Sequence, residues 1–588
     1  MYILGISAFY HDSAACLIKD GEILSAVQEE RFTRIKHDAA FPINAINFCL
    51  KRENISIKDI NYIAYYEKPF LKFERILESY LACVPFGVFS FLKSIPVWLK
   101  QKIWIKDIIK KELNYKGKII FTEHHESHAA SAFFTSSYED AAFLTIDGTG
   151  EWCTTTYGKG ENNKIKIMAD IKFPHSLGLL YSAFTYYLGF KVNSDEYKVM
   201  GLAPYGEPVY KKTIYNNLID LEEDGSFKLN LKYFNYVSGL TMTNKKFSKL
   251  FNLKPRKYNS VISQEHMNMA SSIQQVTEEI IIKLAKHVKK ITKKNNLCMA
   301  GGVALNCVAN GRLLREKIFD KIYIQPSAGD AGGAIGAALI TWYHYLNNNR
   351  IIESKKDFMK GALLGPDYSN EEIEKYLIKN KILYKKLNNT ILLKETAKLI
   401  NENKIIGWFQ GRMEFGPRAL GARSILANAK NENMREILNK KIKFRESFRP
   451  FASAVLEEDV SKYFDLQTKS SYMLLAMPVK ESRLKKLSAK EQKLKGFDKL
   501  NIVRSNIPSV THVDNSSRIQ TVNKEDNPLF YKLLLQLKKD FKYSVIINTS
   551  FNRKDEPIVC TPEDAYKCFI KTEIDYLIMG NFLIKKSK

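Results

Sequence analysis

The chain has 588 residues and a formal net charge of +27; hydrophobic residues make up 45% of it and charged residues 26%. This is a globular balance, and at roughly 100–200 residues per domain the length allows three or four compact domains or two large ones. Composition therefore excludes a disordered tail, a collagen-like rod and a disulfide-stapled miniprotein. The eight cysteines are scattered without a CxxC motif, so we expect reduced thiols in a cytoplasmic protein.

Four features bear on membranes and nucleic acids. Met1–Ser7 lacks the basic segment and long apolar run of a signal peptide, and the apolar stretch Tyr80–Leu92 is shorter than the about 20 residues that span a bilayer. For Ile95–Leu113, a membrane-surface role is the alternative to the solvated amphipathic helix that we favour, and we expect no stable insertion. Lysine is spread along the whole chain with no separate basic arm, which indicates small polyanionic substrates rather than nucleic acid.

The first 35 residues predict strand, polar turn, strand, hairpin and strand. The three strands are Tyr2–Ser7, Ala14–Ile18 and Glu22–Gln28. The same order recurs in Ala141–Asp147, Thr154–Tyr157 and Lys164–Lys172, with a glycine turn at Gly148–Gly150. Two copies of this pattern predict an internally duplicated α/β domain of the actin-like type, in which two such turns face a nucleotide cleft.

Two more glycine turns each follow a predicted strand and precede a predicted helix. Asn296–Ala300 leads into Gly301–Gly302, and Lys321–Gln325 leads into a turn that contains Gly329. Such turns present backbone N–H groups to phosphate. We therefore expect nucleotide-binding residues of the first domain at Gly148, Thr149, Gly301, Gly302, Asn306 and Gly329.

A polar, lysine-rich segment, Asn347–Lys356, and the turn Gly365–Pro366 indicate a domain boundary. We expect a first domain over residues 1–355, a linker over 356–386 and a second α/β domain over 387–588.

A metal site is indicated by histidines and acids at matching positions. His124 and His128 are four residues apart on a predicted helix, so both imidazoles lie on one face and can share a metal. The run is not HExxH, because one residue separates Glu126 from His128, and a zincin is excluded. Asp147 and Asp330 both lie where strands end in glycine turns. Imidazoles with oxygen donors suit iron, manganese or zinc.

His11 lies in the first polar turn, beside Asp12 and Ser13. A histidine with a pKa of about 6.5 suits a base that takes a proton from a hydroxyl. A turn histidine bonded to the backbone is the equal alternative.

In the second domain, arginines and lysines are fixed between glycine and proline turns. They lie in Glu414–Asn428, which contains Gly416–Pro417, and in Lys443–Val455, which contains Pro450. Fixed guanidinium groups match phosphate oxygens. Phenylalanines interleaved with these cations indicate a lined pocket rather than a wet surface.

Seven motifs together resemble the O-carbamoyltransferase family, over nearly the whole chain. They are His11–Ala15, Glu29–His37, the His124/His128 pair, Ile146–Glu151, Lys198–Ala203, Gly301–Asn306 and Glu414–Asn428. The resemblance implies a duplicated actin-like first domain, similar to the actin-like proteins of tRNA threonylcarbamoylation. It also implies a smaller α/β second domain, similar to the partner that makes carbamoyl-adenylate there.

The resemblance implies a reaction in two steps. The second domain would form carbamoyl-adenylate from carbamoyl phosphate and ATP with Mg²⁺, and the first would transfer the carbamoyl group to a hydroxyl of a sugar-containing acceptor, either a glycan or a secondary metabolite. By motif, the metal ligands are His124, His128, Asp147 and Asp330, with Fe²⁺ favoured over Mn²⁺ and Zn²⁺. The catalytic residues would be His11 and Lys36. The second site would use Arg418, Arg423, Lys443, Arg449, Arg518, Asn548 and Ser550.

The sequence departs from the family at His512–Gln520, which reads His-Val-Asp-Asn-Ser-Ser-Arg-Ile-Gln where members carry His-Val-Asp-Gly-Thr-Ala-Arg-Pro-Gln. Asn515 replaces the glycine, and asparagine tolerates the left-handed conformation, so the turn is expected to persist. Without the proline, a looser loop at Arg518 is expected.

Two other functions fit part of the sequence. One is a tRNA-modifying or RNA-binding enzyme of the threonylcarbamoylation type, whose tRNA affinity would fall steeply with salt. The other is a nucleotide-gated binding protein that hydrolyses ATP without carbamoyl phosphate. Neither explains the rigid arginine segment of the second domain as well. The sequence allows a homo-oligomer and does not identify the acceptor.

Overall fold

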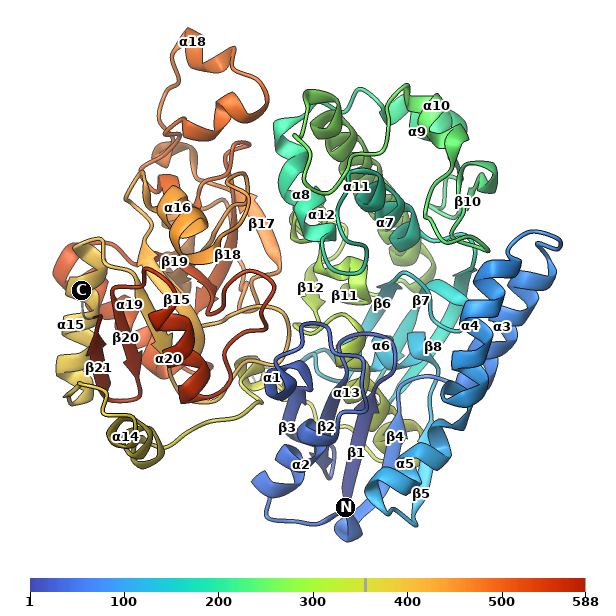
Figure 1. Cartoon of the computed structure of the whole chain (residues 1–588), viewed down its shortest axis with the longest axis horizontal. Coiled ribbons are helices and arrows are strands. Elements are labelled where there is room, and N and C mark those ends of the chain that lie inside the picture. The colour runs from blue at the N-terminus through green and yellow to red at the C-terminus, as the bar shows by residue number, and fades with distance from the viewer. Residues whose placement is uncertain (354–356, 587–588) are drawn as a thin grey trace. The chain divides into compact units, whose positions relative to one another are not determined.

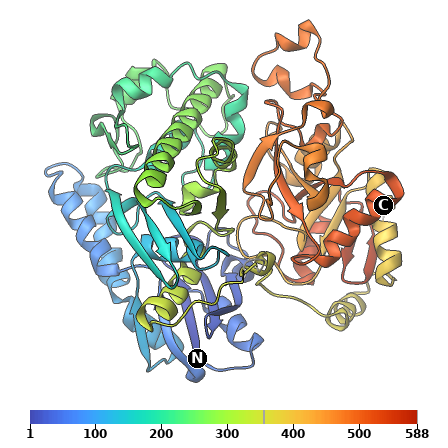
Figure 2. The same ribbon diagram turned by 180° about the vertical axis from the view of Figure 1, so that it is seen from behind.

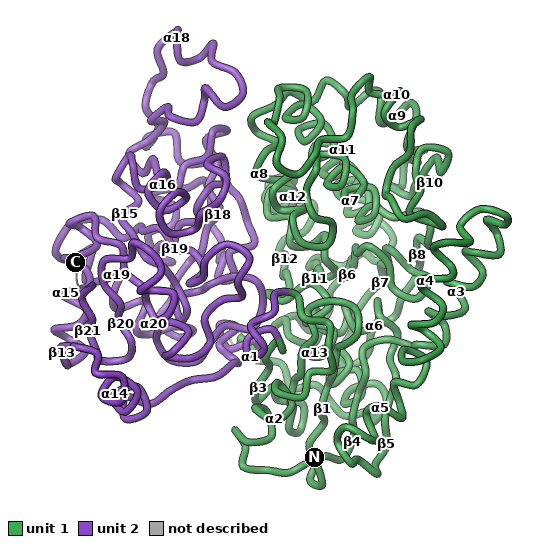
Figure 3. The backbone as a smooth tube through the Cα atoms, in the orientation of Figure 1, with its two compact units in different colours: residues 1–29, 37–358 green, residues 30–36, 359–588 purple. Residues whose placement is uncertain are grey.

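The computed structural model describes residues 1–353 and 357–586, which form two compact units (Figure 1). The first unit contains residues 1–29 and 37–358, and the second contains residues 30–36 and 359–588 (Figure 3). The boundary predicted between residues 355 and 356 lies outside the described residues.

Most of the segment predicted as a linker, 356–386, belongs to the second unit instead, which begins again at Met359. Helix α14 (Asn370–Lys379) and strand β13 (Lys385–Lys386) lie in this segment. Because β13 pairs with β21 (Phe582–Lys585), the segment is tied into the second unit's sheet.

The first unit contains two five-stranded sheets with the same strand order. The first sheet has the order β3 (Glu22–Gln28), β2 (Ala14–Lys19), β1 (Tyr2–Ser7), β4 (Ile60–Tyr65), β5 (Lys118–Phe121). The second has the order β8 (Lys164–Lys172), β7 (Cys153–Glu161), β6 (Asp140–Ile146), β11 (Asn296–Ala300), β12 (Lys321–Ile324). In both sheets the first three strands form antiparallel hairpins and the last two run parallel to the first strand. The predicted α/β class and duplication are confirmed.

Each half of the first unit ends in a helix that follows its last strand. Helix α6 (His124–Phe133) follows β5, α13 (Asp330–Ile340) follows β12, and the two helices pack against each other. Small residues along α13 allow this close approach, since a Cβ on Gly336 would lie 1.8 Å from the carbonyl oxygen of Ser127 on α6. Glycine is therefore required where the two helices cross.

The other helices of the first unit cover the sheets and extend from them. They are α2 (Ile43–Arg52), α3 (Pro69–Leu81), α4 (Val88–Lys100), α5 (Ile105–Leu113), α7 (Leu177–Tyr187), α8 (Glu196–Leu202), α9 (Lys211–Asn217), α10 (Lys245–Phe251), α11 (Gln264–Thr292) and α12 (Cys307–Arg315). The longest, α11, packs against α7, α8 and α12 (Figure 2). Across residues 1–353 and 357–586, no helix combines the length and apolarity needed to cross a membrane. All eight cysteines are in the described part of the chain, and all are free.

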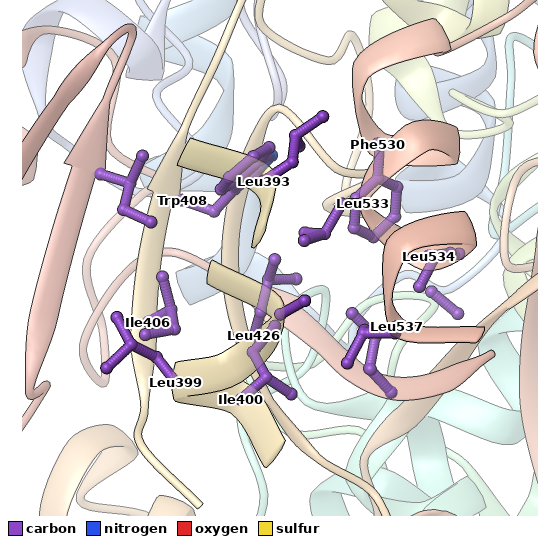
Figure 4. Packing of buried hydrophobic residues seen from close by; sticks show 14 of the residues in the cluster. Leu393, Leu399, Ile400, Ile406, Trp408, Leu426, Phe530, Leu533, Leu534 and Leu537 are labelled. Atoms are coloured by element: carbon purple, nitrogen blue, oxygen red, sulfur yellow. The ribbon is translucent and has the colours of Figure 1, made fainter. Parts of the chain in front are cut away.

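The second unit is built on a nine-stranded mixed sheet. Its order is β13, β21, β20 (Tyr576–Met579), β14 (Ile406–Phe409), β15 (Arg423–Asn428), β19 (Val545–Ser550), β16 (Ala452–Leu456), β18 (Ser516–Val522), β17 (Leu475–Pro478). Helices α15 (Asn389–Asn401) and α19 (Pro528–Phe541) pack together against it and enclose an apolar core (Figure 4). On α19 the buried residues Phe530, Leu533, Leu534 and Leu537 repeat at the spacing of one helical face.

The segment 30–36, with the short helix α1 (Glu30–Thr33), belongs to the second unit although its neighbours in sequence belong to the first. Arg31 Nη2 donates to the carbonyl of Gly416 at 2.9 Å. Arg34 donates to the carbonyls of Ile558 and Pro557 at 2.7 and 2.8 Å. These hydrogen bonds from arginine side chains to backbone carbonyls attach residues 30–36 to the second unit.

Candidate metal centre and active site

The two predicted metal-binding histidines are positioned by the way α6 begins. The backbone N–H of His124 donates to both carboxylate oxygens of Glu151, at 3.0 and 3.1 Å. The carboxylate accepts a hydrogen bond from an N–H in the first turn that has no partner within the helix. Its negative charge also interacts favourably with the positive end of the helix dipole. With the first turn fixed, His124 and His128 lie on the same helical face, and both are buried.

Two carboxylates from the second half of the unit face these imidazoles. Asp147 follows β6, and its Oδ2 lies 3.0 Å from His124 Nε2 and 3.1 Å from His128 Nε2. Asp330 begins α13, and its Oδ1 lies 3.8 and 4.0 Å from the same two nitrogens, which are 3.1 Å apart. The structure therefore brings all four predicted ligands together, with their ligand atoms within 4.8 Å of one another.

The backbone aims Asp147 at this centre. Its second oxygen, Oδ1, accepts hydrogen bonds from the N–H groups of Gly148 at 2.8 Å and Gly302 at 3.2 Å. Oδ2 is thereby turned toward the imidazoles. Gly301 makes the turn that carries Gly302, with φ at +90° and its Cβ position 2.3 Å from the carbonyl oxygen of Ile146, so only glycine fits there.

The four side chains are strongly coupled electrostatically. Burial lowers the pKa of His124, but the hydrogen bond to Asp147 and the charge of Asp330 outweigh it and raise the pKa to about 9. Burial raises the pKa of Asp147, but the two imidazoles hold it well below its usual range. In the described part of the chain, Asp330 Oδ2 is buried without a hydrogen-bond partner.

This donor set fits a divalent cation. Two imidazole nitrogens and two carboxylates are common ligands of iron, manganese and zinc. The 3.1 Å between the two Nε2 atoms is close to the spacing of two nitrogens that are each about 2.1 Å from one ion at nearly a right angle.

His11 lies at the edge of the four-ligand cluster. Its Nε2 is 3.9 Å from Asp330 Oδ2, and its Nδ1 is 3.2 Å from Asp12 Oδ2. Because an ionised carboxylate only accepts, Nδ1 carries the hydrogen and Nε2 is left to take a proton. The other oxygen of Asp12 accepts from His37 Nδ1 at 2.8 Å, and His37 Nε2 lies 3.2 Å from Ser194 Oγ. Burial lowers the pKa of His11, but without a bound cation the charges of Asp330 and Asp12 outweigh burial and raise it well above its usual value. A cation held by Asp330 would offset that carboxylate's charge and lower the pKa of His11 again, which would leave Nε2 free to act as a base.

Some of the predicted nucleotide-binding residues of the first unit already make hydrogen bonds within the protein, and two of the glycines have open space beside them. The N–H groups of Gly148 and Gly302 bind Asp147, and the Asn306 side chain accepts from the N–H of Ala309 and pairs with Gln274. The space at the Cβ position is open at both Gly148 and Gly329, and Gly329 precedes α13.

Thr149 and Lys36 complete the predicted residues of the first site. The Thr149 hydroxyl accepts from Arg75 Nη1 at 2.8 Å. Lys36 is half-buried and belongs to the 30–36 segment of the second unit. A catalytic role for Lys36 stays a prediction.

In the second unit, the sheet brings distant predicted residues to one edge. Strand pairing places Ser424 opposite Ser550, Asn548 opposite Ala452, and Ser453 beside Ile519. The starts of β15, β16 and β18 therefore lie at the same edge as the end of β19. The predicted residues in or near these strand ends are Arg418, Arg449, Arg518, Asn548 and Ser550.

Lys443 is buried at this edge. Its amine donates to the Ser550 carbonyl and, at 2.8 Å, to Asn552 Oδ1. Burial and the charges of Arg445 and Arg449 lower its pKa well below the usual value. The charges of two arginines therefore lie close to one buried amine, an arrangement that favours an anionic ligand.

Two other predicted residues of this site hold the backbone. Arg423 is 0% exposed, and its guanidinium donates to the carbonyls of Gln410, Gly411, Ala422 and Pro366. Asn548 Nδ2 donates to the Ala419 carbonyl at 3.1 Å and to Gln520 Oε1 at 2.7 Å. Arg423 thus has a structural role, which the prediction of a substrate-binding arginine did not include.

Glu414 has a role that sequence reasoning missed. Its Oε1 accepts from the N–H groups of Leu420, Ala422 and Arg423 at 2.8, 2.8 and 3.1 Å, so it folds the arginine-bearing loop. Its place at the head of the 414–428 motif was the available signal. The predicted left-handed turn at Asn515 is confirmed, with φ at +63°.

Comparison with known proteins agrees with this organisation. Residues 2–339 match the family described as carbamoyltransferase N-terminus, and residues 397–586 match carbamoyltransferase C-terminus. The chain is 54% identical to the protein sll1178 of Synechocystis sp., over 100% of this chain and 97% of that one. It is 35% identical to the nodulation protein NolNO of Sinorhizobium fredii, over 99% and 80%. It is 26% identical to nodulation protein U of Rhizobium tropici, over 94% and 91%. The chain belongs to the carbamoyltransferase family and is an enzyme of that type.

Proposed function

We propose that the chain is an ATP-dependent O-carbamoyltransferase that divides its reaction between the two units. In the second unit, carbamoyl phosphate, ATP and water would yield carbamoyl-adenylate, phosphate and pyrophosphate. In the first, the hydroxyl oxygen of a sugar-containing acceptor would attack the carbamoyl carbon and AMP would leave.

The observation that carries the proposal is the position of His11 beside the four-ligand cluster. Asp12 fixes its tautomer, and Nε2 is on the side of Asp330. The side chain is 24% exposed, so an acceptor hydroxyl can approach it. His11 would take the proton of that hydroxyl as the new C–O bond forms.

His124, His128, Asp147 and Asp330 would hold the metal, with Fe²⁺ favoured over Mn²⁺ and Zn²⁺. When bound, the cation would supply a Lewis acid that stabilises negative charge on oxygen. Among the residues themselves, the base His11 lies next to the buried carboxylate of Asp330.

The cations at the sheet edge of the second unit support the activation step. Lys443 is buried there, and Arg449 precedes β16 at the same edge. Negative charge on phosphate and carbamate oxygens needs fixed positive groups in a water-poor site. Arg449 is 3.6 Å from Glu446, which can orient it toward a substrate.

The two steps can be separated by substitution. His11→Asn should still release pyrophosphate from ATP when carbamoyl phosphate is present, but should carbamoylate the acceptor at least a hundredfold more slowly. Arg449→Ala should lose both activities by about a hundredfold or more. Arg483→Ala, on a half-exposed arginine that stacks over Tyr463, is the matched control and should keep both.

The proposal fails if folded His11→Asn with normal metal content loses pyrophosphate release. It fails equally if Arg449→Ala still carbamoylates from carbamoyl phosphate at the wild-type rate.

A further inference from the structure

The helical hairpin of α3 and α4 exposes an unusual concentration of apolar side chains. The two helices lie side by side at the edge of the first unit in both views (Figures 1 and 2). The exposed apolar residues of the hairpin and its tip include Leu81, Val84, Phe86, Val88, Phe89 and Leu92. Phe86 is 76% and Phe89 80% exposed. Isolated exposed apolar residues are ordinary, but a contiguous set indicates a binding surface.

The hairpin's fold does not need these side chains. Its inner face is formed by Phe73 stacked on Trp98 with centroids 6.0 Å apart, and by Tyr80 edge-on to Phe91 at 5.3 Å. The Tyr80 hydroxyl also bonds Ser90 and Ser94, at 2.8 and 3.0 Å. Along α4, therefore, one apolar face packs against α3 and another apolar face is exposed. A helix that is apolar on opposite faces is ordinarily covered on both.

The charged residues in the tip and the second helix of the hairpin have one sign. Between Ser79 and Lys106 the chain contains four lysines and no aspartate or glutamate. Lys93, Lys100 and Lys106 are exposed. The nearest acids along the chain are Glu78 and Asp107, outside the tip. An apolar tip that is followed by lysines complements a partner with an apolar interior and an anionic outer layer.

We infer that this hairpin surface, residues 81–104, docks on an anionic lipid bilayer. The tip side chains would enter the boundary between headgroups and acyl chains, and the lysines would face lipid phosphates. Each helix has 13 residues, about 20 Å in length, whereas a bilayer core is about 30 Å thick, so the hairpin lies in the interface and does not cross it.

Charge argues against a second copy of this chain as the occupant. Pairing two copies of the same surface would bring their lysines together with no acid between Ser79 and Lys106 to pair with them. The exposed Trp104 also suits a bilayer interface, where an amphipathic ring is favoured. The inference does not depend on which acceptor the enzyme uses.

The test is co-sedimentation of the full chain with vesicles of phosphatidylcholine, alone or with about one-third phosphatidylglycerol. We expect binding to the anionic vesicles to be about tenfold or more tighter than to neutral ones and to weaken with salt. Phe86→Ser/Phe89→Ser should lower vesicle binding at least tenfold. Lys93→Gln/Lys100→Gln should remove most of the preference for anionic lipid.

Val261→Ser/Leu383→Ser is the matched control, since both residues are 87% exposed and lie outside the hairpin, and it should bind vesicles like wild type. A second readout is tryptophan fluorescence, which should shift to the blue with anionic vesicles in wild type but not in Trp104→Phe.

Wild type that stays in the supernatant with anionic vesicles would overturn the inference. So would equal vesicle binding by Phe86→Ser/Phe89→Ser. A wild-type dimer that this double substitution converts to monomers, without vesicle binding in either form, would assign the surface to a second copy instead. Because the substituted side chains are exposed, the melting temperature of each variant should equal that of wild type. A lower melting temperature would show that a variant is misfolded.

Discussion

The two halves of the first unit share one topology but supply different chemistry. In the first half, the turn after β1 carries His11 and the helix after β5 carries His124 and His128. In the second half, the turn after β6 carries Asp147 and the helix after β12 carries Asp330. Every nitrogen donor of the candidate site comes from the first half, and every metal-facing carboxylate comes from the second.

This difference shows how a duplicated fold makes one asymmetric site. The paired helices α6 and α13 and the two strand-end turns place equivalent positions near one another. The two halves have diverged into different roles. The carboxylates of one half supply negative charge, and either protonated imidazoles of the other half or a bound cation can balance it. The following predictions test that division.

The largest effect is expected at Asp330, which faces both the imidazole pair and His11. Asp330→Asn should keep the shape of the side chain but remove its charge, and carbamoylation should fall about a thousandfold. Initial rates of acceptor carbamoylation measure this. Asp320→Asn, on an exposed residue just before β12, should leave the rate unchanged. Equal rates for the two variants would break the division of roles.

A smaller loss is expected at Asp12, which bonds His11 through one oxygen and His37 through the other. Asp12→Asn should lower kcat for transfer about a hundredfold with little change in KM, because it disturbs the tautomer and orientation of the base. His37→Gln, one bond farther away, should lower it about tenfold. A larger loss from His37→Gln than from Asp12→Asn would place the base elsewhere.

The smallest effect concerns the helix crossing. Alanine in place of a mid-helix glycine gains about 1 kcal/mol of helix propensity, whereas forcing a Cβ into packed backbone costs about 1–3 kcal/mol. Since the Cβ of Gly336→Ala would meet the Ser127 carbonyl, we expect a net destabilisation of up to about 2 kcal/mol. Denaturant melts measure it, with Gly329→Ala, whose Cβ position is open, as the control. Stabilisation by Gly336→Ala would mean that the crossing is looser than described.

The sequence predicted the parts of the site that depend on local patterns. The four-residue spacing of His124 and His128 and the strand-end positions of Asp147 and Asp330 are local, and all four converge as expected. The hairpin order of the first strands likewise predicted the duplication. Helical spacing and strand–turn boundaries persist in the fold because short-range geometry determines them.

The features that sequence reasoning missed depend on contacts distant in sequence. No local pattern predicts that Arg423 is buried under four carbonyls, because the fate of a guanidinium depends on the loop folded over it. The contact of His37 with Ser194 spans 157 residues, and the contact of Arg34 with Ile558 spans 524. Strand β13 pairs with β21, which is about 200 residues later in the sequence. Because no local pattern indicates such a distant partner, the segment before β13 resembled a linker.

The most direct test of the account is the metal content of the His124→Ala/His128→Ala variant. Wild type and the variant are each dialysed against Fe²⁺ under anaerobic conditions, and in parallel against Mn²⁺ or Zn²⁺, then passed through a desalting column and analysed for bound metal. His287→Gln, on a half-buried histidine that contacts Tyr157, is the control. We predict about one ion per chain in wild type and in the control, and close to none in the double variant. Equal metal in all three proteins, or none in wild type with any of the three ions, would contradict the account.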